Sequence, residues 1–319
     1  SMLHNTENQY ICTSIKGARA YKAVRRTEQR REMKRGLVLE GGGLRGMFTV
    51  GVTDVMMEEG IEFDGMIGVS AGATFGCNFK SHQPSRALRY SIRFRNDRRY
   101  MGLYSLFTSG DLVNAEFCYR TVPNQYDLFD YDRFEQDSTE FQVVCTDALT
   151  GQPVYKRLDS LRGEAMDWLR ASASMPIVSR PVHVAGRTLL DGGIADSIPL
   201  KHFQQEGYRR CVVVLTQPEG FRKHQTKTLP LFRLLMKRYP CITEAMARRH
   251  VMYNGQLDYL HSQEEQGNAL VIYPHDTLPI GRVQQDKKRM ERVYRMGREA
   301  ATEALPRLKE FMRKDQGDE

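Results

Sequence analysis

Short apolar runs alternate with longer amphipathic stretches along this chain, and the first two such units indicate the fold class. Residues 36–40 form an apolar run that enters a glycine-rich segment, and residues 47–59 follow with apolar side chains at helical spacing. Residues 63–69 repeat the apolar run, and small residues follow them at helical spacing. Two successive strand-to-helix units are typical of parallel strands joined by helical crossovers. We therefore predict a layered α/β protein.

The same patterns predict the later elements. Strands are expected at 140–146, 154–156, 187–191, 211–216 and 269–273. Helices are expected at 85–94, 166–173, 229–237, 244–262 and 284–313. Residues 97–138 are aromatic and polar without a regular period, and a connection of this length is typical of a lid or binding loop.

The chain shows no clear linker, so we expect a single domain preceded by an N-terminal arm. Residues 1–35 are polar and basic, and we expect a loosely attached N-terminal arm with a short helix at 18–32. The remainder has no internal repeat or low-complexity tract, so we expect one domain at 36–319. Its predicted parts are a motif-bearing core at 36–216, the insertion at 97–138 and a helical C-terminal part at 220–319.

The composition is that of a globular protein with a substantial core. The chain has 319 residues, of which 40% are apolar and 27% are charged. No apolar run reaches the roughly 18 residues of a membrane span, and the N-terminal residues lack a signal-peptide core. The six cysteines are scattered and include no C-x-x-C pair, which favours buried reduced thiols and a cytoplasmic location.

The net charge of +8 is concentrated in two stretches. Residues 16–35 hold nine basic side chains against two acidic ones, and residues 86–99 hold six arginines against Asp97. Such stretches are typical of solvated surface, or of a surface that contacts anionic lipid headgroups. We expect peripheral contact with an anionic membrane surface. We expect no nucleic-acid partner, because zinc-finger spacing, RNP-type aromatic patterns and heptads are missing.

The segment Gly68-Val69-Ser70-Ala71-Gly72 carries the first candidate for chemistry. It joins a predicted strand to a predicted helix and has the Gly-x-Ser-x-Gly spacing of a nucleophile elbow. In such a turn the serine is strained, and side chains two positions away on either side would collide. An ordinary turn whose serine caps a helix has the same five residues. A nucleophile therefore requires a base and an oxyanion hole elsewhere in the chain.

The glycine-rich segment from Gly41 to Gly46 is a candidate oxyanion hole. It follows a predicted strand and opens a helix, so its backbone N–H groups can turn toward a bound oxygen beside a positive helix end. Arg45 is expected to reinforce the site by its charge or by fixing the loop.

The same glycines also fit a dinucleotide fingerprint, because Gly41, Gly43 and Gly46 have G-x-G-x-x-G spacing. That fingerprint expects an acidic residue at the end of the next strand, to hold a ribose. Here Asp64 stands at the start of that strand, which counts against a nucleotide site. A purely structural glycine turn remains an alternative.

Two kinds of base are open for Ser70. A triad in the order Ser, Asp, His would use one of the later histidines, and His202 is the best placed of them. The other candidate is Asp191, which ends a predicted strand and precedes Gly192 and Gly193. A partly buried carboxylate with a raised pKa can take a serine proton directly. A tight turn is the alternative explanation of Asp-Gly-Gly.

Together these motifs resemble the patatin-like phospholipase family, in its bacterial form. Gly41 to Gly46 is similar to that family's Gly-Gly-Gly-x-Arg-Gly oxyanion loop, and Gly68, Ser70 and Gly72 match its elbow. Asp191 to Gly193 is similar to its Asp-Gly-[Ala/Gly] motif. The resemblance covers about residues 36–216, with the motifs in the family's order.

The resemblance implies a three-layer α/β/α fold with a mostly parallel central sheet. It further implies hydrolysis of lipid acyl esters, as a phospholipase A or lipid acyl hydrolase, by a Ser–Asp dyad. Ser70 would be the nucleophile and Asp191 the general base. The amides of Gly42 and Gly43 would line the oxyanion hole with support from Arg45, and no metal or cofactor would be needed.

Three points accompany this implication. The aromatic residues of 100–134 are expected to cover an acyl chain, and the arginines of 86–99 to face phosphate headgroups. A carboxylesterase or thioesterase acting on soluble acyl substrates is one alternative. A non-catalytic, membrane-associated regulatory module is another.

Overall fold

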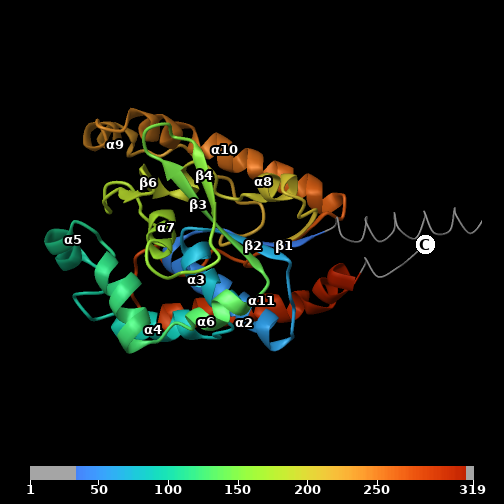
Figure 1. The fold of residues 1–319 in the computed structure, drawn as a ribbon. Coiled ribbons are helices and arrows are strands. Elements are labelled where there is room, and N and C mark those ends of the chain that lie inside the picture. The colour runs from blue at the N-terminus through green and yellow to red at the C-terminus, as the bar shows by residue number, and fades with distance from the viewer. Residues whose placement is uncertain (1–33, 314–319) are drawn as a thin grey trace, which may run out of the picture.

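The central sheet has eight strands, and five of them run parallel to one another (Figure 1). The structure is a computed structural model that describes residues 34–313. The strands are β1 (Arg35–Leu39), β2 (Gly65–Val69), β3 (Glu140–Asp147), β4 (Pro153–Arg157), β5 (Val182–Val184), β6 (Arg187–Asp191), β7 (Arg210–Val214) and β8 (Ala269–Ile272). Their order is β5-β6-β3-β2-β1-β7-β8, with β4 paired to β3. The five from β3 to β8 in this order are parallel, whereas β4 and β6 each pair antiparallel with β3, and β5 pairs antiparallel with β6.

Helices cover both faces of this sheet. They are α2 (Met47–Glu58), α3 (Ala71–Lys80), α4 (Arg86–Phe94), α5 (Leu103–Ser109), α6 (Tyr131–Gln136), α7 (Ala165–Ser172), α8 (Leu200–Gln205), α9 (Leu229–Leu235), α10 (Pro240–Glu265) and α11 (Lys287–Arg313). Short 3₁₀-helices η1 (Gly43–Gly46) and η3 (Gly192–Ile194) and the π-helix η2 (Phe117–Tyr126) complete the set.

The alternation of side chains along β1 shows the layers directly. Leu37 and Leu39 join the core cluster formed with α2, α3 and α11, whereas Val38 joins the cluster formed with α8 and α10. Successive strand side chains point to opposite faces, so the sheet has a helical layer on each side. The predicted α/β class and the mostly parallel three-layer arrangement are confirmed.

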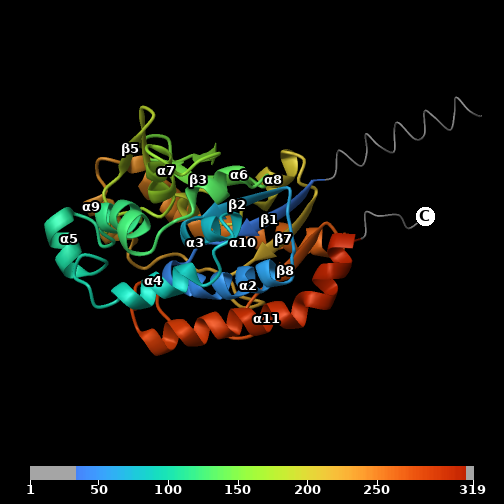
Figure 2. The same cartoon turned by 60° about the horizontal axis from the view of Figure 1, so that its bottom comes forward.

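The C-terminal residues extend this architecture. β8 adds a fifth parallel strand beside β7, and α11 packs along α2 (Figure 2). The expected helical C-terminal part therefore also contributes a strand to the same sheet. The predicted N-terminal arm and its helix at 18–32 lie outside the described residues, apart from Lys34 and Arg35.

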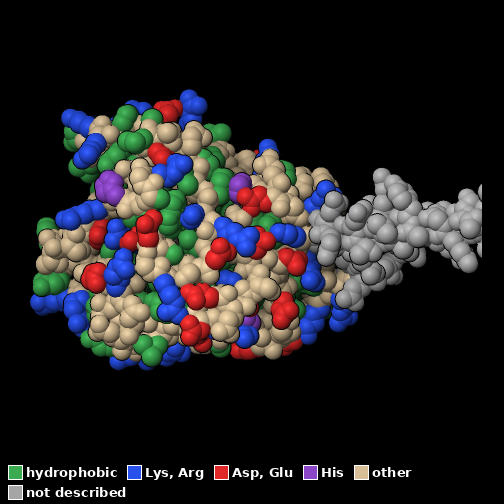
Figure 3. Space-filling model, in the orientation of Figure 1, with side chains coloured by type: hydrophobic (Ala, Val, Ile, Leu, Met, Phe, Trp, Pro, Cys, Tyr) green, Lys and Arg blue, Asp and Glu red, His purple; other side chains and the backbone are tan. Residues whose placement is uncertain are grey.

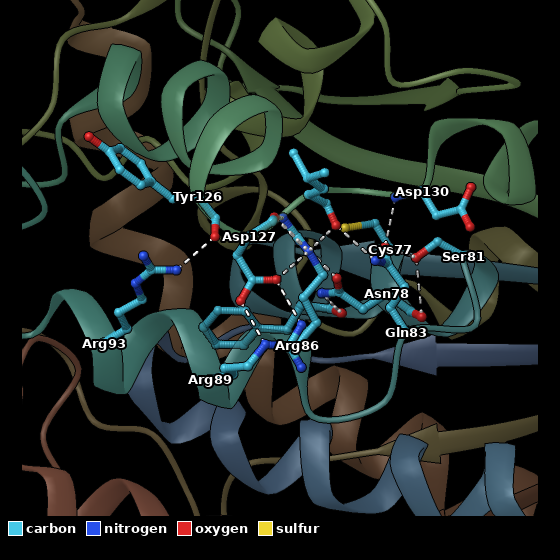
Figure 4. A network of polar contacts seen from close by, with 12 residues as sticks. Cys77, Asn78, Ser81, Gln83, Arg86, Arg89, Arg93, Tyr126, Asp127 and Asp130 are labelled. Carbon is cyan, nitrogen blue, oxygen red and sulfur yellow. Dashed lines mark hydrogen bonds and ion pairs between the residues drawn. The ribbon is translucent and has the colours of Figure 1, made fainter.

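Residues 97–138 differ from the sequence-based expectation of an irregular segment. They contain α5, η2 and α6, and η2 has Pro123 inside it. Long-range contacts hold the segment: Arg86 is buried against Asp127, and Arg89 donates two hydrogen bonds to the Asp127 carboxylate at 2.8 and 2.7 Å (Figure 4). Arg93 donates to the carbonyl oxygen of Tyr126 at 2.7 Å.

These contacts correct the expectation that the arginines of 86–99 face phosphate headgroups. The expectation is wrong for Arg86, because its side chain is almost fully buried. Arg89 and Arg93 form hydrogen bonds with Asp127 and Tyr126 of the protein itself. Their role here is to attach the insertion to α4.

Candidate active site

Ser70 occupies the turn between β2 and α3, with no other residue between the two elements. Its backbone has φ 54° and ψ −121°, a region that costs a non-glycine residue on the order of 1–3 kcal/mol. A Cβ on Gly72 would overlap the carbonyl oxygen of Leu39, so the turn packs against β1 with no room for a side chain. The Ser70 amide donates to the hydroxyl of Ser172 at 2.9 Å. The Ser172 hydroxyl in turn donates to the carbonyl oxygen of Val144 at 2.7 Å, which ties the strained turn to β3.

Asp191 lies beside Ser70 because β2 and β6 pair with successive parts of the same edge of β3 and run in opposite directions. Val144 of β3 pairs with β4 on one edge and with Val69 of β2 on the other. The next residue, Cys145, pairs with β4 and with Asp191 of β6. β2 and β6 therefore share one edge of β3 and meet end to end. The sequence predicted a strand ending at Asp191, and β6 does end there, antiparallel to β3.

The surroundings of Asp191 raise the pKa of its carboxyl group. Burial is the largest cause, since it disfavours the charged form. Hydrogen bonds from the Ser70 side chain and from the Gly193 amide, the latter 2.8 Å from Oδ1, act in the opposite direction, as does the charge of Arg249. The net rise makes this carboxylate a better proton acceptor than an exposed aspartate.

The glycine segment Gly41 to Gly46 begins directly after β1 and enters η1. Gly43 has φ +59°, and a Cβ there would overlap the carbonyl oxygen of Arg282. That carbonyl accepts a hydrogen bond from the Leu44 amide at 2.8 Å, so the loop before α11 braces the glycine segment. Within residues 34–313, the amides of Gly42 and Gly43 have no hydrogen-bond partner. They remain available to a bound oxygen, and they line the same cavity as Ser70.

Glu40 is a structural participant that the sequence-based reasoning missed. Its buried carboxylate accepts from the Thr216 amide at 2.7 Å and from the Tyr253 hydroxyl at 2.7 Å. The Thr216 hydroxyl lies 2.8 Å from the carbonyl oxygen of Gly41. This network fixes the start of the glycine segment to the strand ends of β1 and β7. An acidic residue at the end of an apolar strand, immediately before the glycines, was the available signal.

Two cavities adjoin at Ser70. The first, of about 170 Å³, contains Ser70, Asp191 and the glycine segment together with four basic residues: Arg45, Lys223, Arg249 and Arg282. The second, of about 130 Å³, is mainly apolar, and many of its lining residues come from the insertion, among them Tyr100, Met101, Tyr119, Val122 and Phe129. Both cavities share Gly43, Ser70, Met175 and Arg282. An apolar cavity of roughly 150 Å³ holds a benzene-sized ligand, so the second space accommodates several carbon atoms.

The histidine alternative finds no support in this geometry. None of the histidines in the described part of the chain lines either cavity. His202 stacks on Tyr155 with ring centroids 3.4 Å apart and pairs with Glu206.

Two features are absent from residues 34–313. No group of three or more His, Cys, Asp or Glu side chains in this part of the chain is arranged to hold a metal ion. None of its helices is both long and apolar enough to cross a membrane.

Comparison with known proteins places this site in a family context. Residues 37–203 match the model of a family described as Patatin-like phospholipase, and residues 239–313 match a Domain of unknown function (DUF6363). The protein YjjU of Escherichia coli K12 is 31% identical over 185 residues, which are 57% of this chain and 52% of that protein. An NTE family protein of Mycobacterium bovis is 29% identical over 164 residues, 51% of this chain and 44% of that protein.

Two more distant similarities concern a longer curated protein and a solved structure. Lysophospholipase NTE1 of Cryptococcus neoformans is 27% identical over 180 residues, 56% of this chain and 11% of that protein. The matched region thus spans about half or less of the length of these curated relatives. The structure of VipD from Legionella pneumophila aligns with a TM-score of 0.42 and 13% identity, over 86% of this chain and 67% of that one. The Patatin match extends over more than half of the chain and includes both Ser70 and Asp191, and the chain therefore belongs to the patatin-like phospholipase family.

Proposed function

We propose that this protein hydrolyses acyl esters of lipids through a dyad of Ser70 and Asp191. The observation that carries the proposal is the burial of Asp191 against the Ser70 side chain, in a cavity that the free amides of Gly42 and Gly43 also line. Nucleophile, base and oxyanion donors thereby converge on one space, which is what acyl transfer requires.

The proposed reaction has two steps, acylation of Ser70 and hydrolysis of the acyl-Ser70 ester, and the second step restores the free enzyme. Asp191 accepts the hydroxyl proton as Ser70 Oγ attacks the ester carbonyl carbon. The amides of Gly42 and Gly43 stabilise the oxyanion, and one such donor contributes roughly 2.7–4 kcal/mol. The bond to the leaving alkoxide breaks, Asp191 returns the proton to it, and an acyl-Ser70 ester remains. Water then attacks this ester, Asp191 accepts a proton from the water, and Ser70 leaves as the hydroxyl with that proton.

The apolar cavity supports a lipid as the acyl donor. It adjoins Ser70, and aromatic and aliphatic side chains of the insertion form much of its wall. An acyl chain whose carbonyl lies at Ser70 would enter this cavity, in agreement with the expectation that residues 100–134 cover it. Because the cavity accommodates several carbon atoms, it would hold the part of an acyl chain nearest the carbonyl group.

Exposed apolar side chains on α5 and α9 support peripheral contact with a lipid surface. Phe107 of α5 is 85% exposed, and Leu231 and Leu234 of α9 are more than half exposed. The two helices lie at the same end of the molecule in Figures 1 and 2, and Phe232 of α9 lines the first cavity. Basic residues accompany them: Arg233, Lys237 and Arg238. Figure 3 shows hydrophobic and basic side chains together at this end.

A fluorophosphonate probe tests the hydrolase proposal. We expect labelling of the wild type and none of Ser70→Ala, with both proteins folded. A folded wild type that is not labelled would contradict the serine mechanism. A screen of phospholipids, glycerides and short-chain thioesters, run with both proteins, then separates lipid hydrolysis from the esterase alternative.

Sedimentation with vesicles tests the surface contact. We expect binding to phosphatidylglycerol vesicles that weakens with salt and with a Phe107→Ser, Leu234→Ser double variant. Equal sedimentation of the variant and the wild type would rule out this end of the molecule as the docking surface.

A further inference from the structure

The first cavity holds more positive charge than its protein surroundings balance. Its cationic wall consists of Arg45, Lys223, Arg249 and Arg282, and Glu40 and Asp191 are the only carboxylates among the described residues that line it. Within residues 34–313, none of the four cations forms an ion pair within 4 Å.

The two carboxylates in this cavity are already engaged. Glu40 accepts from Thr216 and Tyr253, and Asp191 accepts from Ser70 and the Gly193 amide. Their charges offset part of the repulsion at Arg45, Lys223 and Arg249, but two carboxylates face four cations, so a net positive charge remains.

This arrangement is costly for the protein alone. Burial lowers the pKa of Arg45 and of Arg249, and Arg282 repels both. Burial is also the main cause that lowers the pKa of Lys223 to about 7, with repulsion from Arg249 adding to it. The Arg45 Nε is buried without a hydrogen-bond partner. Half-buried cations that repel one another, with the Arg45 Nε unpaired, favour a bound anion, which would relieve the repulsion and accept the unmet hydrogen bond.

The cationic wall is held in place by contacts with neighbouring backbone and rings, and the Lys223 Nζ lies 4.1 Å from the centre of the Tyr253 ring. Arg249 of α10 donates through Nε to the carbonyl oxygen of Gly193, and its Nη2 lies close to the same glycine. The backbone of Arg282 braces the glycine segment through Leu44. Lys223 is fixed through its backbone, which donates to the Asn254 side chain at 2.9 Å. An anion binding here would meet donors that are already positioned beside Ser70.

We propose that the cationic wall binds a negatively charged phosphate group of the substrate, so that the protein prefers acyl esters with an anionic polar group over zwitterionic or neutral ones. This inference rests on the proposed lipid acyl hydrolysis and adds its substrate class. Lys223, Arg249 and Arg282 all follow the Patatin match, which ends at residue 203. Arg249 and Arg282 lie inside the match to the Domain of unknown function, so that region supplies the recognition of the anion.

The test compares three substrates that share one oleoyl chain and differ in charge: lysophosphatidylglycerol, lysophosphatidylcholine and monooleoylglycerol. We expect kcat/KM to fall in that order. Lys223→Gln and Arg282→Gln should each lower the ratio of the first to the last by roughly tenfold, the effect of losing one charge-assisted hydrogen bond. Lys223→Arg, which keeps the charge, should restore most of the ratio.

Lys227→Gln is the matched control. Lys227 lies in the same loop, is exposed, and lines neither cavity, so this variant should keep the wild-type ratio. Thermal melting of every variant checks that each is folded.

Calorimetry with Ser70→Ala protein separates a lipid headgroup from free phosphate. We expect lysophosphatidylglycerol to bind more tightly than inorganic phosphate, and Lys223→Gln in this background to weaken both. Equal turnover of the three substrates, with a ratio that Lys223→Gln leaves unchanged, would overturn this inference and leave the hydrolase proposal standing. Wild type that cleaves no acyl ester would overturn the hydrolase proposal, while the calorimetry would still report on the anion site.

Discussion

Replacing Asp191 with asparagine should lower the activity while leaving the stability unchanged or higher. Asparagine has nearly the same shape, and its side-chain oxygen can still accept from the Gly193 amide, but it cannot take a proton from Ser70. Loss of a general base costs about 10²–10⁴ in rate. At 1.36 kcal/mol per tenfold change, that is roughly 3–5 kcal/mol of transition-state stabilisation.

The stability effect has the other sign. The folded protein raises the pKa of Asp191, because burial outweighs the contacts that favour its charged form. A carboxyl group with a raised pKa adds to stability only while it is protonated, and that contribution disappears as the pH rises through its folded-state pKa. Above that pKa the wild type carries a buried charge that Asp191→Asn removes, so the melting temperature of the variant at pH 7 should equal or exceed that of the wild type. This advantage should vanish below the unfolded-state pKa of about 3.9.

The assay pairs kcat/KM on a chromogenic ester with melting curves at pH 7 and pH 3.5. Asp196→Asn is the matched control: Asp196 is also buried with a raised pKa, yet it binds Tyr155 and Gln256 and lines neither cavity. We expect it to keep its activity. Asp191→Asn activity within threefold of the wild type would refute the role of Asp191 as base. A large drop in its melting temperature at pH 7 would refute the argument from burial.

Three further outcomes follow from the site. Ser172→Ala removes the acceptor of the Ser70 amide, so we expect a stability loss of about 1–3 kcal/mol in denaturant titrations and a lower kcat; an unchanged kcat would show that the turn keeps its strain without this bond. Gly43→Ala forces a Cβ into the Arg282 carbonyl at a left-handed backbone, and displacement of one oxyanion donor should lower kcat by about 10²–10³ while KM changes little. Because the pKa of Lys223 is about 7, this side chain loses its proton as the pH rises from 6 to 8, and KM for lysophosphatidylglycerol should rise over that range. The same KM profile in Lys223→Gln would assign the titration to another group.

Much of the secondary structure could be predicted because its signals are local. Apolar periodicity predicted β6 at its observed bounds, and it placed α2 and β3 to within one residue. The segment at 97–138 could not be predicted in this way. η2 contains a proline, and the contacts that stabilise this region join Asp127 to Arg86 and Arg89, far away in the chain.

The sequence alone determined the family, the α/β class and the position of the strained serine. These depend on neighbouring residues: Ser70 needs small residues within two positions of it, and that requirement is visible as Gly68 and Gly72. Tertiary structure decided which groups surround that serine. Asp191 lies beside it only because β6 follows β2 along one edge of β3 in the antiparallel direction, a matter of strand pairing between distant segments. The cationic wall likewise depends on how the loop after β7, α10 and the loop before α11 pack over the strand ends. No periodicity in the chain marks the three cations that these segments bring to the cavity.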